Sequence, residues 1–444
     1  MTSKGRHLSA AIALTLSAGA HAGMGNIGTT YGLMPTDVGT AQALSLFNTE
    51  VSAAYYNPAN LIKDGRGALT FGFLHSEPEL RAQQIDGNAN APMRDGRVLS
   101  DERTQQVLIG FKADLSNLTT GDHPVYFGLL AGVDKFGREL LAFNAQKSED
   151  GQFFQYGRQP LFINLGVGTK IWRGISAGAG ARVTLHAEAD LDATTTLGGE
   201  TSEESLQVNA KPHVTPILGV NMDLGDTFCP AGSCWLSGWD VAAAYRGKST
   251  AKTAVNGDVL VDGISGGDEF LPLRINALDS AHPEIYTLGV QYEGEHWRVG
   301  ATAEHQRWGQ ISTEFKSDTI KNDGNIDLRN ITIPRIGVEY KFSRLFSVMG
   351  GLAYEESVFR STTNPEVNYL DTDRYILGLG GKLTLCSLPF MAVPVTLGFG
   401  YQYHYLDERT FELVNFEGTT DETRETVEAD GNVHVLMGSL SLRF

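Results

Sequence analysis

The sequence predicts an all-β protein: a fourteen-stranded antiparallel transmembrane β-barrel with a small N-terminal plug, or hatch, in its lumen. Three observations carry this prediction. After Ile62 the hydrophobic residues recur with a period of two, the strands are long, and long connections alternate with short ones. A period of two indicates strands with one apolar face. Loops that are long on one side and short on the other are typical of outer-membrane barrels.

The N-terminus reads as a secretory signal peptide. Residues 4–7 give a basic start, residues 8–20 form a short apolar run, and residues 20–22 read Ala-His-Ala, a small-residue cleavage site. The run is too short to cross a bilayer as a helix. The predicted division is therefore a signal peptide over 1–22, a plug over 23–62 and a barrel over 63–444.

Composition narrows the class of protein. The net charge of the 444 residues is -17, which argues against a nucleic-acid partner because such proteins carry a basic patch or stripe. After the signal peptide, no apolar run approaches the ~20 residues of a membrane helix. An exported chain of this kind is either soluble or a barrel.

The strand at 394–406 shows the alternation most clearly. Odd positions from Val395 to Tyr405 read Val, Leu, Phe, Tyr, Tyr and Tyr, whereas the even positions between them read Thr, Gly, Gly, Gln and His. Tyr, Trp and Phe often stand near strand ends, as the aromatic girdles of a membrane barrel require. The predicted strands span 67–77, 104–114, 124–135, 160–171, 175–189, 206–224, 236–249, 282–293, 296–308, 330–342, 345–357, 373–385, 394–406 and 433–444.

The connections between these strands alternate in length. The short ones must face the periplasm, where both termini also lie, and a soluble sandwich gives no reason for such sorting. The long connections are 78–103, 136–159, 190–205, 250–281, 309–329, 358–372 and 407–432. The short connections are 115–123, 172–174, 225–235, 294–295, 343–344 and 386–393.

Three cysteines are present. Cys229 and Cys234 lie close enough in sequence to form a small disulfide loop, and a periplasmic turn permits it. Cys386 is left over. A metal site is less favoured, because no second ligand pair with zinc-like spacing lies nearby, and we expect neither a metal nor a cofactor.

Four stretches, in this order along the chain, resemble the FadL/TodX-type family of outer-membrane long-chain fatty acid and hydrocarbon transporters. The resemblance implies a monomeric fourteen-stranded barrel with a luminal hatch, and passive uptake of long-chain fatty acids or hydrocarbons. It also implies a lateral opening at a break in the third strand, here at Phe136 and Gly137. The stretches are Asn57-Pro58-Ala59, Glu304 to Trp308, Ile333 to Tyr340 and Asp371-Thr372-Asp373-Arg374.

These stretches have roles that follow from position and charge. Asn57, Pro58 and Ala59 are expected to join hatch to wall, where Asn-Pro is also an ordinary turn starter. Asp371, Asp373 and Arg374 are expected to form an ion pair in the lumen or at its rim. Unpaired charges facing lipid at mid-depth would be unfavourable by about 2–4 kcal/mol each.

Ligand-lining candidates are apolar residues in places where loops or a plug would be expected to be polar. Capture in an extracellular apolar pocket is one interpretation, and mutual packing that folds the loop is the other. The candidates are Met24 and Phe47 of the hatch, and Leu140, Leu141, Phe143, Phe153 and Phe154 of the second long loop.

The function predicted for this chain is passive uptake of hydrophobic small molecules through the outer membrane of a Gram-negative bacterium, as a monomer that contacts outer-membrane lipid and lipopolysaccharide. It is not expected to be an enzyme. Two alternatives stay open. A phospholipase-like enzyme would need a Ser or Asp beside a His on the wall. A general porin would leave an aqueous channel, usually within about sixteen to eighteen strands.

Overall fold

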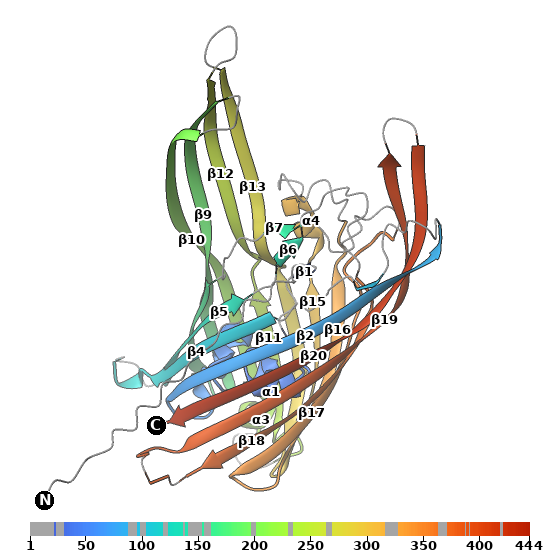
Figure 1. The fold of residues 1–444 in the computed structure, drawn as a ribbon. Coiled ribbons are helices and arrows are strands. Elements are labelled where there is room, and N and C mark those ends of the chain that lie inside the picture. Colours follow the sequence, from blue (N-terminus) through green and yellow to red (C-terminus); the bar gives the residue numbers. More distant parts are fainter. Residues whose placement is uncertain are drawn as a thin grey trace, which may run out of the picture.

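The wall is a closed antiparallel barrel, formed by fourteen strands within the described residues (Figure 1). It closes because the last strand pairs with the first, with Leu442 opposite Leu69. The wall strands are β2 (Ala68–Asp86), β4 (Thr104–Asp114), β5 (Val125–Lys135), β8 (Leu161–Trp172), β9 (Ile175–Thr196), β10 (Thr201–Asp223), β11 (Trp239–Arg246), β14 (Ile285–Glu293), β15 (Trp297–Gln306), β16 (Ile331–Lys341), β17 (Phe346–Glu355), β18 (Arg374–Leu385), β19 (Val395–Glu417) and β20 (Asp421–Arg443).

The computed structural model also contains shorter strands and several helices. None of the helices among the described residues is long and apolar enough to cross a membrane. These elements are β1 (Ala22–Gly23), α1 (Pro35–Gly39), η1 (Ser45–Phe47), α2 (Ala53–Tyr56), η2 (Pro58–Ile62), β3 (Gly96–Arg97), η3 (Ser116–Leu118), β6 (Arg138–Leu140), β7 (Phe153–Phe154), α3 (Leu224–Phe228), β12 (Ser249–Asp262), β13 (Glu269–His282) and α4 (Gly309–Phe315). The structure describes residues 22–23, 31–87, 96–97, 104–118, 123–135, 138–140, 153–154, 161–196, 201–229, 234–262, 269–315, 327–362, 371–386, 388–389, 391–417 and 421–444.

The outer face of the wall is apolar and is edged by aromatic rings. Large hydrophobic side chains such as Phe73, Leu288 and Phe399 are about half exposed, as expected for residues that face lipid rather than a protein core. Ring pairs occur toward both ends of the barrel, which matches the girdles of a membrane barrel. They are Trp239–Tyr292, Trp297–Tyr340 and Phe342–Phe346 at the short-turn end, and Tyr245–Tyr286 and Tyr354–Tyr375 at the other.

Three connections predicted as long loops are largely strand, and this part of the prediction was wrong. The ranges 190–205, 250–281 and 407–432 are mostly occupied by hairpin arms that rise beyond the wall (Figure 1). The β19–β20 ladder, for example, continues to Glu417 opposite Asp421. The alternation of lipid-facing apolar side chains stops at the edge of the lipid. Two paired arms still form backbone hydrogen bonds beyond it, because those bonds do not need a lipid-facing side.

Four of these arms form one sheet above the barrel, which we call the fin: β9, β10, β12 and β13 (Figure 1). β10 pairs with β11 as far as Ile217 opposite Arg246. Beyond that point the chain crosses to the other edge of β9, where β12 runs parallel to it from Thr253 opposite Ala187. The crossing places the base of the fin directly above the lumen.

The plug fills the barrel lumen with residues 31–62. These residues form α1, η1, α2 and η2, and nearly all of their side chains are buried. The segment has a hydrophobic interior of its own and also contacts β8, β9, β18 and β19 of the wall. The lumen is therefore occupied by packed protein. The inner face of the wall is shielded from solvent wherever the plug covers it.

Candidate functional site

The plug is held by direct backbone contact with glycines on the inner face of the wall. A Cβ at Gly351 would lie 2.0 Å from the carbonyl oxygen of Thr40, and one at Gly168 would lie 2.3 Å from that of Pro58. A Cβ at Gly178 would come within 2.4 Å of the same segment. Only a residue without a side chain permits such an approach. Two glycine patches on opposite sides of the lumen thus clamp α1 and η2.

Asn57 fastens the end of the plug to the wall. Its side chain is fully buried, accepts a hydrogen bond from the Ala59 amide at 3.2 Å, and donates to the carbonyl oxygens of Leu46 at 3.2 Å and Val220 at 3.3 Å. Val220 belongs to β10, so one amide links the plug interior, the η2 turn and the barrel. Pro58 begins η2, where a missing amide proton carries no penalty.

Buried hydrophobic side chains form a continuous band from the plug to the β19–β20 hairpin. Each is at most 8% exposed, and all belong to one contact cluster. We call this set the apolar band. It comprises Tyr31, Leu33, Met34, Val38, Val51, Tyr55 and Tyr56 of the plug; Leu74, Ala82, Leu108, Leu130, Phe162 and Ile217 of β2, β4, β5, β8 and β10; and Leu406, Phe411, Leu413, Val427, Ala429, Val433, Val435 and Met437 of β19 and β20.

The band reaches the upper edge of β5. A Cβ at Gly132 would lie 2.4 Å from the Phe162 ring and 2.5 Å from Leu108, so these two side chains meet over the glycine. Among the described residues, the last pair of the β5–β8 ladder is one residue further on, at Val133 opposite Leu161, where the described part of β8 begins.

On its β4 side, β5 stays paired further. Its ladder with β4 continues to Lys135 opposite Gln105, two residues beyond its last partner on β8. The predicted gate residues Phe136 and Gly137 lie outside the described residues. Within the described part of the wall, β5 is therefore paired on both sides up to Val133 and on one side only above it.

The opposite part of the lumen carries buried charges. Arg246 of β11 forms an ion pair with Glu304 of β15, and Arg335 of β16 lies 3.6 Å from the same carboxylate. Arg335 also donates to the carbonyl oxygen of Ala41 in the plug at 2.9 Å. Most of the apolar band lies over β20, β2, β4, β5 and β8, although Lys112 of β4 is also buried there, and this group of buried charges lies over β11, β15 and β16.

Two of the three residues in the predicted ion-pair cluster face each other. Arg374 Nη2 lies 2.7 Å from Asp371 Oδ1, and its Nε lies 4.0 Å from Glu355 Oε1. Asp373 instead accepts a hydrogen bond from the Tyr354 hydroxyl at 2.8 Å. Neighbouring side chains in an extended segment point to opposite faces, which separates Asp373 from Arg374.

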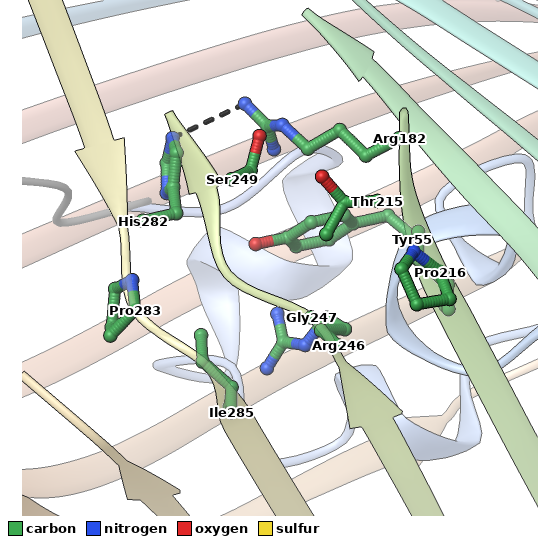
Figure 2. Close-up of a pocket in the computed structure, with 11 residues that line it drawn as sticks. Tyr55, Arg182, Thr215, Pro216, Arg246, Gly247, Ser249, His282, Pro283 and Ile285 are labelled. Carbon is green, nitrogen blue, oxygen red and sulfur yellow. Dashed lines mark hydrogen bonds between the residues drawn. The ribbon is translucent and has the colours of Figure 1, made fainter. Parts of the chain in front are cut away.

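A small polar cavity lies at the base of the fin, beside the plug residue Tyr55 (Figure 2). The space open to the centre of a water molecule is about 10 Å³, roughly what one buried water requires. An Arg182 Nη atom lies 3.2 Å from His282 Nε2 on its upper side. The lining residues are Tyr55, Arg182, Thr215, Pro216, Ile217, Arg246, Gly247, Ser249, His282, Pro283 and Ile285.

The other predicted residues lie in varied places. Phe47 is 1% exposed and packs with Leu46, Ala242 and Ala244 at the plug–wall contact, so it belongs to a core. The backbone of Leu140 pairs with that of Phe153, and the preceding residue with Phe154, in the small β6–β7 ladder. The residues outside the described ranges are Met24, Leu141 and Phe143.

The cysteines lie at the short-turn end of the barrel. Cys229 and Cys234 are joined by a disulfide beside α3, in the connection between β10 and β11. Cys386 is free and exposed, directly after β18. The disulfide closes the turn between β10 and β11 and lies outside the paired strands of the wall.

Comparison with known proteins places the chain in a family. It is 51% identical over 441 residues to alkane uptake protein A of Marinobacter nauticus, an alignment that covers 98% of this chain and 95% of that protein. The chain belongs to the FadL-type family of outer-membrane transporters. No protein-family model matches the sequence.

Solved FadL-type structures share the fold. A Pseudomonas aeruginosa FadL homologue superposes with a TM-score of 0.61 at 15% identity, covering 95% of this chain and 99% of the other. The Pseudomonas putida toluene transporter TodX superposes with a TM-score of 0.52 at 13% identity, covering 94% and 99%.

Family membership supports the coarse function, the uptake of hydrophobic molecules by a barrel of the outer membrane. The relatives are named as an alkane uptake protein and a toluene transporter.

Sequence reasoning missed the polar cavity and most of the apolar band. Leu74 and Met437 stand on the inner face of their strands, opposite the lipid-facing residues, so an apolar residue at such a position was a usable signal. Arg182 follows Gly178 and Gly180 on the same inner face of β9. The partners of Arg182 could not be found in this way, because they come from other strands.

Proposed function

We propose that this chain takes up hydrocarbons, with n-alkanes as the best supported class, by moving them along the apolar band and releasing them sideways into the membrane. The observation that carries the proposal is the band itself, a single cluster of buried hydrophobic side chains that runs from the β19–β20 hairpin to the plug. A relative named for alkane uptake, 51% identical to this chain, supports the same class.

The physical argument concerns the phase that the solute must cross. A hydrocarbon gains nothing by leaving lipid for a water-filled pore, since its transfer into water is unfavourable. An apolar strip beside a packed plug offers a continuous hydrophobic surface and leaves no aqueous route. The charged side of the lumen, with Arg246, Glu304 and Arg335, holds the plug and need not touch the solute.

The proposed exit lies near Val133 of β5, the last residue whose partner on β8 is described, whereas the pairing of β5 with β4 is described as far as Lys135. Phe162 and Leu108 cover the inner side of this edge. Their movement would connect the band to the surrounding lipid.

The band is tested by changing one side chain without changing its volume much. Met437→Gln should lower uptake of radiolabelled hexadecane by cells several-fold, because an amide in the band must be desolvated without a partner. Met437→Leu is the matched control and should transport normally. The folded amount is measured for each by heat-modifiable migration. Equal uptake by the two variants would contradict the band as the route.

The exit is tested by a crosslink. Val133→Cys with Leu161→Cys should close the last rung of the β5–β8 ladder, lower hexadecane uptake when oxidised, and regain it on reduction. A second pair lower in the same ladder, Phe127→Cys with Val167→Cys, is the control and should have no effect. Unchanged uptake with the upper pair fully oxidised would remove the lateral exit while leaving the band intact.

We further propose that the barrel works as a monomer whose outer rim contacts lipopolysaccharide. The apolar outer face, open all round the described wall, supports immersion in lipid. Native mass spectrometry of the barrel released from lipid nanodiscs should give a monomer with bound lipopolysaccharide. A stable dimer would contradict this proposal.

A further inference from the structure

Two guanidinium groups share one tyrosine ring in the polar cavity at the base of the fin. Cζ of Arg246 lies 4.6 Å and Cζ of Arg182 lies 5.4 Å from the centre of the Tyr55 ring, and the two arginines are 5% and 7% exposed. Arg246 has Glu304 as its counter-charge. In the part of the chain that the structure describes, Arg182 forms no ion pair with a carboxylate.

The contact between Arg182 and His282 defines the state of the imidazole. A guanidinium nitrogen can only donate a hydrogen bond, so His282 Nε2 must accept the bond at 3.2 Å. The proton of the neutral ring then sits on Nδ1. His282 Nδ1 is buried and has no hydrogen-bond partner within the described residues, so it is an unused donor.

Four further polar atoms of this cavity's lining are buried without a partner within the described residues: Nε of Arg182, Nε of Arg246, Oγ1 of Thr215 and Oγ of Ser249. The two guanidinium nitrogens are donors, and the two hydroxyls can donate. None of the five atoms is an obligate acceptor. In Figure 2 the ends of Arg182, Ser249 and Thr215 gather on one side of the Tyr55 ring.

A group of unused donors beside an uncompensated cation requires an acceptor. A buried charge without a counter-charge and buried donors without acceptors are both strongly unfavourable. Water would satisfy some of the donors and could give its own protons to the hydroxyl oxygens of Thr215 and Ser249, but it would leave the charge of Arg182 without a counter-charge. A negatively charged acceptor satisfies the donors and the charge together.

We propose that this cavity is a binding site for a small monovalent anion, with chloride as the occupant. The size of the space restricts the occupant to a single atom, because it has no room for a carboxylate with its carbon and two oxygens. The anion would link Arg182 of β9, Thr215 of β10 and Ser249 of β12 above the Tyr55 ring of the plug. The site borders the proposed hydrocarbon route, because Tyr55 and Ile217 belong both to its lining and to the apolar band.

The test compares salts on the full mature barrel in a zwitterionic detergent. At constant ionic strength, replacing sodium gluconate by sodium chloride or bromide should raise the Tm of the barrel by several degrees, since a ligand that binds only the folded state stabilises it. The rise in Tm should level off at high halide concentration. The Arg182→Met variant should lose this rise. Arg307→Met, which removes a partly exposed arginine paired with Glu284 outside the cavity, should keep it.

Direct binding is followed by the line width of the ³⁵Cl resonance. The resonance should broaden with the native protein and should broaden less with Thr215→Val. This variant has nearly the same side-chain volume and remains informative if Arg182→Met does not fold. Identical Tm values in chloride and gluconate would overturn the proposal. So would an undiminished chloride response in Arg182→Met. A response to sodium dodecanoate alone would also overturn it, and would assign the cavity to the head group of an amphiphile.

Discussion

Replacing Gly351 with alanine should loosen the plug without damaging the wall. The new Cβ would stand 2.0 Å from the carbonyl oxygen of Thr40, whereas real Cβ contacts essentially never fall below 3.0 Å. The plug or β17 must therefore retreat by about 1 Å, and overpacking of this kind is unfavourable by about 1–3 kcal/mol. Because the obstacle is backbone, no side-chain rotation relieves it.

The matched control is Gly438→Ala in β20, where a new Cβ meets nothing within 4 Å. That change should be neutral, or stabilising by up to about 1 kcal/mol through the restricted unfolded chain. The two variants place the same methyl group on the same barrel. Only its position relative to the plug differs between them.

The assay has two readouts. Planar-bilayer recording should detect ion leak through Gly351→Ala but not through Gly438→Ala, because displacement of α1 opens water-filled space beside it. Thermal unfolding in micelles should place Gly351→Ala below the control. If the two variants conduct equally and melt together, the clamp is not what holds the plug.

Three further predictions concern charge and sidedness. Burial raises the pKa of Asp37, a plug residue, from 3.8 to about 6. The folded state thus favours the protonated acid, so the stability of the barrel should fall as the pH rises from about 4 to about 6. Asp37→Asn should flatten that part of a curve of melting temperature against pH. A curve that keeps its slope in the variant would implicate another group. Arg374→Met leaves its buried carboxylate partners uncompensated and should lower the free energy of unfolding, measured by denaturant titration, by about 3–5 kcal/mol. Arg360→Met, at an exposed pair, should change the same free energy by at most about 1 kcal/mol. Equal effects would refute the buried pair. In intact cells, a membrane-impermeant maleimide should leave Cys386 unlabelled and should label Thr410→Cys in the β19–β20 hairpin, while the reverse pattern would invert the orientation of the barrel.

Much of the wall was predictable because its signal is local. Each strand alternates between lipid-facing apolar residues and small or polar luminal ones, so a window of ten residues suffices to find it. The strand at 104–114 has the same bounds in the sequence prediction and in the structure. The hairpin arms beyond the lipid edge were not predicted as strands, although Phe411 and Leu413 alternate with polar residues, because the arms have no lipid-facing side and are strands through pairing with the opposite arm.

The buried polar residues of the lumen depend on contacts between distant segments. Arg246 and Glu304 are 58 residues apart in the chain, and the unpartnered atoms of the proposed anion site come from β9, β10, β11 and the two ends of the β12–β13 hairpin. Sequence shows which of these side chains point inward, since strand alternation determines the face. It does not show which inward-facing residues meet, because that depends on barrel closure and on the course of the fin above the plug.

The sequence by itself therefore determined the class of the molecule: a membrane barrel of fourteen strands, long loops on one side, a segment before Ile62 left for the lumen, and a resemblance to hydrophobic-compound transporters. The tertiary structure decided how the lumen is divided. Glycine patches bring the plug backbone against the wall, charges gather on one side and aliphatic side chains on the other. That division arises because a curved, closed sheet brings together residues from strands hundreds of positions apart, and no local pattern encodes those encounters.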